Sequence, residues 1–455
     1  MSRKTSYRIH SFTGVFTGLM LFIICWSGSF AVIAYELDWL VIPEMRSSGN
    51  GERISWGTVE DSVKSEFPGA RVRFIMAPQY DNANYEAIVS MPDYKTIRRV
   101  FVDAYSGEVR GEQSFYNTWK FFSNFHRDLF LGKFGEYFAT FFSFVLFVSL
   151  LSAIVFYRHW WKRFFRLPRG EGRAYWSELH RLAGLWSLWF IAIIALTGAW
   201  YFYEHAKYDV GGNLNYIDVE PYGSVQIPEP ANSRLTRPLS LDGAVNTAKA
   251  TWPELEISLI AYGWYSGNRD NVYLQGQTNF PLLRDRANQI HVNTKTGEVL
   301  WQNEWNELPT YWVVSNMADP LHFGDFAGLY GKIVYFIFGI ALSGIILTGT
   351  WMHIKRLVRS GDDRHQWLGV NLSIALSICI LIAATYFAIQ DALKLSSTVE
   401  GVPSVAPLAP GVAAALGVWV LVTITIIAAW SLLLWRPSLF VRDNWKSNKK
   451  ANRTS

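Results

Sequence analysis

Four of the nine histidines recur as two pairs along the 455-residue chain, and imidazole is a common ligand of transition metals. His10 and His180 each stand four residues before a glycine. His126 and His322 each stand six and nine residues before glycines. Equal spacing around residues of one type indicates a tandem duplication, in which each histidine of the first copy has a counterpart in the second.

A duplicated pair of histidines is suited to bind one haem. When two copies are related by a twofold axis, equivalent side chains approach that axis from opposite sides at the same depth. Two imidazoles that face each other across a four-helix bundle are suited to be the axial ligands of a b-type haem iron. We therefore predict two haem b groups, an inner one bound by His10 and His180 and an outer one bound by His126 and His322.

The same histidines also permit a purely structural interpretation. A histidine at a helix end often lies at the membrane interface, bonded to water or headgroups, and a duplication copies such residues too. His353 stands near the depth of His10 and is an alternative inner ligand, although its counterpart in the first copy is Tyr157. The remaining histidines are expected at the interface, on the surface or in loops: His159, His205, His291 and His365.

Glycines near the inner histidines predict room for a flat macrocycle. In a straight helix with about 3.6 residues per turn, positions roughly 4 and 18 residues after a histidine lie on or near its face. The glycines that follow the outer histidines would point away from them on a continuous helix, which indicates helix–helix contact or a helix break. The spacing of 4 and 18 holds for Gly14 and Gly28 after His10, and for Gly184 and Gly198 after His180.

Several other classes of chemistry are excluded. The two cysteines, Cys25 and Cys379, both lie in apolar runs, which excludes a disulfide framework, a CxxC redox centre and a thiolate metal site. No glycine-rich nucleotide-binding motif is present. The electrons for the haems must therefore come from quinol or from a separate donor, and not from a nicotinamide or flavin domain of this chain.

The composition places these residues in a membrane protein. Half of the residues are hydrophobic, only 17% are charged, and 16% are aromatic. About 20 consecutive apolar residues span a bilayer. Six segments meet this requirement, and the first continues into acidic residues without a cleavage site, which indicates an uncleaved helix. The segments are 12–34, 134–157, 182–203, 330–352, 368–390 and 411–435.

The distribution of basic residues predicts the orientation. Segments 1–11, 158–176, 353–366 and 436–455 contain 19 Lys and Arg in 64 residues. The long loops 36–125 and 204–321 contain 18 in 208 residues, with 27 acidic residues. Because short cytoplasmic segments are enriched in Lys and Arg, both termini are expected in the cytoplasm and both loops in the periplasm of a bacterium.

The predicted fold is an α-helical multi-pass membrane protein with six transmembrane helices. Four form a core from the tandem repeat, related by an axis along the membrane normal, and each copy carries a small extracytoplasmic α+β domain. Alternating polar and apolar residues after a short helix indicate the strands of each domain. The divisions are 1–11, 12–34, 35–125, 126–157, 158–180, 181–203, 204–321, 322–352, 353–367, 368–390, 391–410, 411–435 and 436–455.

Aromatic residues crowd the approach to His322 on the outer side. An interfacial belt is the simpler interpretation, and a platform for an external ligand is the alternative. The residues concerned are Trp301, Trp305, Tyr311 and Trp312.

Several motifs together resemble the PepSY-associated transmembrane family. The similarity covers about residues 5–356, so the last two helices fall outside it. In the second copy Asn293 stands where the family usually keeps an aspartate. The motifs are Tyr7-Arg8-Ile9-His10 with Gly14, Leu321-His322-Phe323-Gly324 with Gly328 and Gly331, Leu347-Thr348-Gly349-Thr350-Trp351, and the turn Asp103-Ala104-Tyr105-Ser106-Gly107-Glu108-Val109.

This resemblance implies two PepSY domains in the loops and a bacterial inner-membrane location. Some members of the family are haem-containing ferric-siderophore reductases, which implies that this chain reduces a periplasmic ferric siderophore and releases Fe²⁺ for uptake. Two alternatives stay open: a non-enzymatic anchor whose PepSY domains bind or regulate a periplasmic partner, and a transport-associated permease subunit. The lipid bilayer is an expected partner, and nucleic acid is not.

Overall fold

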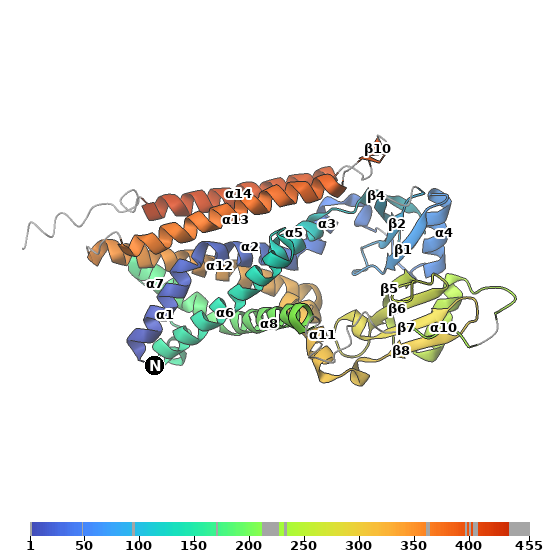
Figure 1. Cartoon of the computed structure of the whole chain (residues 1–455), viewed down its shortest axis with the longest axis horizontal. Helices are drawn as coiled ribbons and strands as arrows, with labels where there is room; N and C mark the ends of the chain where they lie inside the picture. The colour runs from blue at the N-terminus through green and yellow to red at the C-terminus, as the bar shows by residue number, and fades with distance from the viewer. Residues whose placement is uncertain are drawn as a thin grey trace, which may run out of the picture.

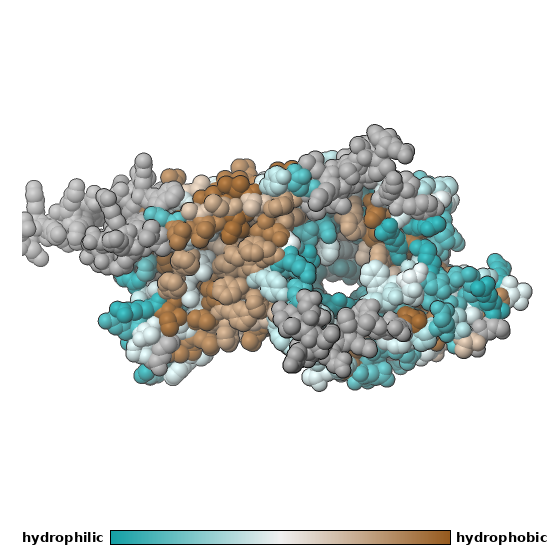
Figure 2. Space-filling view, viewed as in Figure 1, coloured by the Kyte–Doolittle hydropathy of each residue, from teal (hydrophilic) through white to brown (hydrophobic). Residues whose placement is uncertain are grey.

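The computed structural model separates a helical bundle from a sheet domain at one end of it (Figure 1). It describes residues 2–47, 49–92, 96–169, 172–211, 227–231, 234–360, 365–395, 398–399, 402–403 and 408–435. The basic tail expected at 436–455 lies outside the described residues. Hydrophobic residues form a belt around the bundle, and hydrophilic residues cover the sheet domain (Figure 2). This distribution is that of a membrane protein.

Four described helices are long and apolar enough to cross a membrane, and two bent helix pairs raise the number to six if each pair is one span. The multi-pass architecture predicted from the sequence is thus present. The four long helices are α6 (Gly132–Phe156), α12 (Gly328–Ser360), α13 (His365–Leu395) and α14 (Pro410–Trp435). The two pairs are α1 (Arg3–Phe16) with α2 (Gly18–Val32), and α7 (Gly172–Trp186) with α8 (Leu188–Ala206).

The two bends correct the expectation of straight helices over 12–34 and 182–203. The first pair bends by 70° and the second by 62°. Thr17 and Ser187 occupy the breaks, and their ψ angles are 0° and 2°. The Thr17 hydroxyl donates to the carbonyl of Thr13 at 2.5 Å, so a side chain enters the helical hydrogen-bond ladder at the first break. The breaks lie 170 residues apart, as His10 and His180 do.

The bundle packs in the manner of a duplication. Helix α2 lies along α12, and α8, the counterpart of α2, lies along α6, the counterpart of α12. Likewise α1 contacts α6 and α7 contacts α12. Each copy thus buries its apolar faces partly against the other. Short helices connect the bundle to the sheet domain: α3 (Ala34–Val41), α5 (Thr118–Asp128) and α11 (Thr310–Phe323).

Each loop contributes four strands to one antiparallel sheet of eight, so the helix-and-strand units predicted for the two loops share a sheet. The strand order is β4-β3-β2-β1-β5-β6-β7-β8, and β1 and β5 pair at the centre. Pairing these two edge strands satisfies backbone groups that two separate sheets would leave open. The strands are β1 (Arg71–Met76), β2 (Tyr85–Ser90), β3 (Ile97–Val102), β4 (Val109–Ser114), β5 (Glu256–Tyr262), β6 (Asn271–Gln277), β7 (Gln289–Asn293) and β8 (Val299–Asn303).

One face of this sheet forms a single hydrophobic core with two helices, α4 (Trp56–Glu66) and α10 (Leu241–Thr251). Ile75 and Ile260 pair across the junction of the copies, and both are fully buried. Val59 of α4 and Ala244 of α10 are also fully buried in this core. The shared core joins the two copies in one domain, because buried residues of both halves belong to the same hydrophobic cluster.

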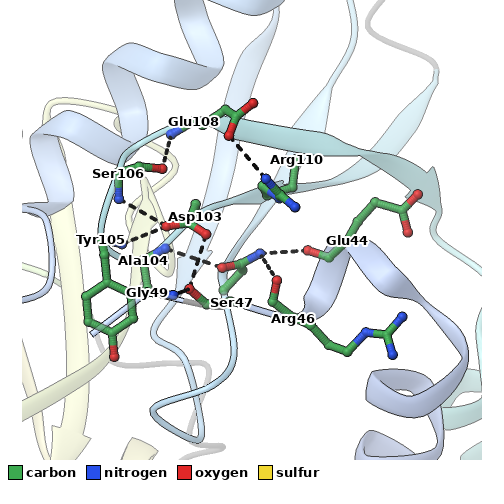
Figure 3. A network of polar contacts seen from close by, with 11 residues as sticks. Glu44, Arg46, Ser47, Gly49, Asp103, Ala104, Tyr105, Ser106, Glu108 and Arg110 are labelled. Atoms are coloured by element: carbon green, nitrogen blue, oxygen red, sulfur yellow. Dashed lines mark hydrogen bonds and ion pairs between the residues drawn. The ribbon is translucent and has the colours of Figure 1, made fainter. Parts of the chain in front are cut away.

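A side-chain cap closes the turn after the third strand of each copy. The Asp103 carboxylate accepts hydrogen bonds from the amides of Tyr105 and Ser106, and the Ser47 hydroxyl donates to it as well (Figure 3). Burial opposes ionisation of Asp103, but these hydrogen bonds outweigh it and lower its pKa. Asn293 uses its side-chain oxygen in the same way. The change from Asp to Asn in the second copy therefore preserves the turn.

His291 is buried, which corrects its assignment to the surface or a loop. It lies in β7 with a fully inaccessible side chain, packed against the rings of Tyr265, Tyr273 and Trp301. Burial lowers the pKa of His291 to about 4, so the ring is neutral near pH 7. Its partners come from three different segments of the sheet domain, which the local sequence pattern did not indicate.

We predict that Asp103→Ala lowers the free energy of unfolding by about 1 to 3 kcal/mol, because two backbone amides lose their acceptor. Asp103→Asn should lower the free energy of unfolding far less, because Asn293 already caps the equivalent turn. The stabilisation from the Asp103 carboxylate is present above its ordinary pKa and is lost as the pH falls through its lowered folded pKa. Thermal unfolding of the full chain in detergent at pH 7 and pH 3 measures both effects. Equal destabilisation by the two substitutions would contradict the cap.

Candidate functional site

The outer histidine pair lies where the short helices meet the bundle. His126 is near the end of α5, and His322 is near the end of α11. The centroids of the two rings are 6.0 Å apart. Residues in the left-handed region end both helices, Leu129 with φ 52° and Gly324 with φ 77°, so each histidine stands in the last turn before a reversal. The structure thus brings together two residues that are 196 positions apart.

The inner pair lies on the bent helix halves at the other end of the bundle. His10 belongs to α1 and His180 to α7, and their ring centroids are 6.4 Å apart. All four histidines are half-buried, so protein atoms cover only part of each ring. The structure therefore brings together the two rings of each predicted pair, at two levels of one bundle.

Each of the four rings is held by its Nδ1 atom. The Nδ1–H of His10 and of His126 donates to a backbone carbonyl, whereas the Nδ1 of His180 and of His322 lies beside a threonine hydroxyl. This leaves Nε2 of each ring for another ligand, which is how metal-binding histidines are usually oriented. The distances are 3.0 Å from His10 to Ser149 O, 2.9 Å from His126 to Ile24 O, 3.3 Å from His180 to Thr348 Oγ1, and 2.7 Å from His322 to Thr197 Oγ1.

The separation of the rings fits one metal ion between them. A metal–imidazole bond is about 2.0 to 2.1 Å long, and the ring centroid lies roughly 1 Å behind the nitrogen, so two opposite ligands have centroids about 6 Å apart. Within the described part of the chain, no group of three or more His, Cys, Asp or Glu converges on one point. Two facing imidazoles without further protein ligands suit a metal whose other ligands come from a macrocycle.

The glycines have different roles from those predicted. A Cβ on Gly28 would lie 2.6 Å from Cε1 of His126, so Gly28 makes room for the outer pair and not for His10. Gly198 instead faces Ser143. The rise along the helix is the reason, because 18 residues extend about 27 Å and carry Gly28 and Gly198 far from the inner histidines even where they share a face. A Cβ on Gly14 or Gly184 would meet nothing within 4 Å, so open space remains beside the inner pair.

The glycines after the outer histidines mark a helix break. Gly132 and Gly328 begin α6 and α12 with φ of 59° and 57°. A Cβ on Gly135 would lie 1.7 Å from the carbonyl oxygen of Asp128. Gly331 has the same close approach, at 2.3 Å, to the carbonyl of Gly324. These glycines let each long helix fold back tightly against the turn that ends the histidine helix.

The other candidate residues do not join the two pairs. The Nδ1 of His353 lies 2.7 Å from a guanidinium nitrogen of Arg356. The four aromatic residues before His322 do not form one platform. Trp301 packs on His291 in the sheet, and Trp305 stacks on Phe280 at 4.8 Å. The other two, Tyr311 and Trp312, belong to α11.

A cavity of about 580 Å³ lies between the sheet domain and α11, the helix that carries His322. Asp319, one turn before His322, lines it and forms an ion pair with Arg284. The Tyr201 hydroxyl donates to the Asp319 carboxylate at 2.6 Å, and the Tyr201 ring centroid is 5.3 Å from that of His322. Sequence analysis missed these residues. The only local signal was Asp319, an acidic residue close to a predicted ligand.

The comparison with known families agrees with this architecture. A family model described as the PepSY-associated TM region matches residues 7–356, which is more than half of the chain. The chain belongs to this family. Both histidine pairs of this PepSY-associated protein lie inside the matched region, whereas α13 and α14 lie outside it. A comparison with curated proteins gives no match.

We predict that Gly28→Ala destabilises this PepSY-associated protein by about 1 to 3 kcal/mol, because the new methyl group must displace the ring of His126. Gly417→Ala is the matched control, since Gly417 also lies in a membrane helix and a Cβ there would meet nothing within 4 Å. Thermal unfolding in detergent measures the difference. Equal stability of the two variants would show that the His126 ring does not pack tightly against Gly28.

Proposed function

We propose that this protein is a b-type haem electron-transfer protein of the bacterial inner membrane, which reduces a periplasmic ferric siderophore and releases Fe²⁺ during iron uptake. One observation carries the proposal: four histidines form two facing pairs, and in every ring Nδ1 is held while Nε2 is left for a metal. Membership of the PepSY-associated family supports it, because some members have this activity.

The chain's own residues would hold two haems. His10 and His180 would bind the inner haem through Nε2, and His126 and His322 the outer haem. The bound iron would supply one-electron transfer between Fe³⁺ and Fe²⁺. The carbonyls and threonine hydroxyls at Nδ1 would fix the ring orientations and raise the basicity of the ligands. The apolar bundle around them would keep water away and so influence the reduction potential.

The direction of electron flow follows from the charge distribution. The short basic segments favour a cytoplasmic location for both termini and a periplasmic location for the sheet domain. The inner pair would then accept electrons from quinol or a separate donor, and the outer pair would pass them to the ferric chelate. Reduction adds one electron to Fe³⁺, and the softer Fe²⁺ is bound less tightly by oxygen-rich chelators, so iron is released.

The cavity beside His322 is the favoured position for the chelate. Its lining contains four carboxylates and two guanidinium groups, which leaves an excess of negative charge when all are ionised. Such a lining repels polyanionic complexes and accepts neutral or cationic ones. We therefore expect neutral ferric hydroxamates to be reduced in preference to polyanionic ferric catecholates. The charged residues are Glu256, Arg284, Asp285, Arg286, Asp319 and Asp325.

The haem content tests the proposal directly. We expect the protein purified in detergent to show a reduced-minus-oxidised spectrum of b-type haem, with two haems per chain by pyridine haemochrome. His180→Ala and His322→Ala should each lose one haem, and the two losses should be spectrally distinct. His205→Ala is the control, because His205 lies beside Glu136 and belongs to neither pair. A colourless protein after haem-replete expression would overturn the proposal.

The acceptor is tested by reoxidation of the reduced protein. In stopped flow, a neutral ferric hydroxamate should reoxidise the haem several-fold faster than a polyanionic ferric catecholate at low ionic strength. Glu256→Gln should narrow this difference, since it removes one negative charge from the cavity lining. Glu254→Gln, two residues away and outside the lining, should leave it unchanged. A faster reaction with the catecholate would contradict the assignment of this cavity.

A further inference from the structure

The last helix, α14, lies outside the region that the family model matches, yet it packs along the bundle (Figure 1). It contacts α3, α5 and α12. Much of its surface is exposed and apolar, for example Leu421 and Ile424, which suits a lipid-facing side. Other side chains point toward the bundle, among them Trp419, Thr423 and Trp430.

Trp430 holds the segment of α12 that meets the inner histidine pair. Its Nε1–H donates to the carbonyl of Leu347 at 3.2 Å. The next residue, Thr348, places its hydroxyl 3.3 Å from Nδ1 of His180. Gly349 follows, and a Cβ there would lie 3.1 Å from Cε1 of His180. Trp430 therefore bonds to the backbone directly before the two residues that contact His180.

Thr423 holds the corresponding segment at the outer pair. Its hydroxyl accepts a hydrogen bond of 2.9 Å from Nε1–H of Trp26 on α2. Trp26 stands midway between Ile24, whose carbonyl accepts from Nδ1 of His126, and Gly28, which lies against the His126 ring. A hydrogen bond to Trp26 therefore fixes the turn of α2 that accepts the hydrogen bond from His126 and packs against its ring.

Trp419 packs against the helix that carries the same histidine. Its ring centroid is 5.2 Å from that of Phe122 and 5.6 Å from that of Phe125, in edge-to-face geometry. Phe125 directly precedes His126 on α5. Aromatic contacts of this kind are worth about 0.5 to 1.5 kcal/mol beyond their buried area. Trp419 therefore limits the movement of α5 where it carries the ligand.

We propose that α14 is a built-in brace, whose Trp430 positions His180 and whose Thr423 and Trp419 position His126. The inference rests on the proposed function in that the histidines are taken as haem ligands. Each polar contact from α14 ends within two residues of an atom that touches a histidine. In the bilayer no water replaces a lost hydrogen bond, so breaking one of these contacts costs more free energy than at a protein surface.

Two conservative substitutions and one control test the brace. Trp430→Phe keeps an aromatic ring and removes the N–H donor, and Thr423→Val keeps the volume and removes the acceptor. Thr425→Val is the matched control, because the Thr425 hydroxyl donates to the carbonyl of Leu421 within its own helix. Redox titration and electron paramagnetic resonance then report on the two low-spin haems separately. We expect Trp430→Phe to shift the midpoint potential and the resonance spectrum of the inner haem only. Thr423→Val should shift those of the outer haem only, and Thr425→Val should shift neither.

Amide hydrogen exchange supplies a readout that does not depend on haem. Peptides covering residues 24–28 should exchange about fivefold faster in Thr423→Val. Peptides covering residues 347–351 should do so in Trp430→Phe. A fivefold change in rate corresponds to the loss of one neutral hydrogen bond. If the purified protein contained no haem, the proposed function would be wrong, but the exchange rates of the variants could still be compared. Unchanged exchange in these peptides, or equal changes in the Thr425→Val control, would overturn the brace.

Discussion

The anchoring of each histidine through Nδ1 is the interaction on which the arrangement of the bundle depends. Inside a bilayer a polar ring atom without a partner is costly, so every ring must find an acceptor on a neighbouring helix. His10 finds it on α6, His126 on α2, His180 on α12 and His322 on α8. Each bond therefore joins two helices of one copy, and the four bonds fix the fold of each copy, while the packing of α2 on α12 and of α6 on α8 joins the copies.

The duplication gives the two copies equivalent histidine positions, but the groups that hold the histidines differ between the copies. In the first copy the acceptors are backbone carbonyls, and in the second they are threonine hydroxyls. The hydroxyls of Thr197 and Thr348 donate to carbonyls of their own helices, so toward the rings they act as acceptors, as the carbonyls do. The sheet domain repeats this relation: Asp103 and Asn293 cap equivalent turns with a charged and a neutral oxygen. Equivalent geometry is kept while the charge differs.

The fused sheet and the cavity connect the domain to the bundle. Pairing of β1 with β5 joins the two copies in one sheet. The cavity is built by the second copy alone, with Glu256 of β5 and Arg284 of the β6–β7 connection on one wall and α11 on the other. The same helix carries His322. A ligand in the cavity would lie beside Asp319, one turn before His322 on that helix. Helix α14 stabilises this end of the bundle from the opposite side, through its contacts with α2 and α5.

The sequence by itself determined the membrane class, the duplication and the identity of the four paired histidines, because long apolar runs and repeated spacings are local patterns. Only the tertiary structure decided the bends at Thr17 and Ser187 and the contact of Gly28 with His126 of the outer pair. It also decided the fusion of the two sheets and the burial of His291. These features depend on contacts between residues far apart in the chain, such as Ile75 with Ile260, whose pairing leaves no signal in either segment alone.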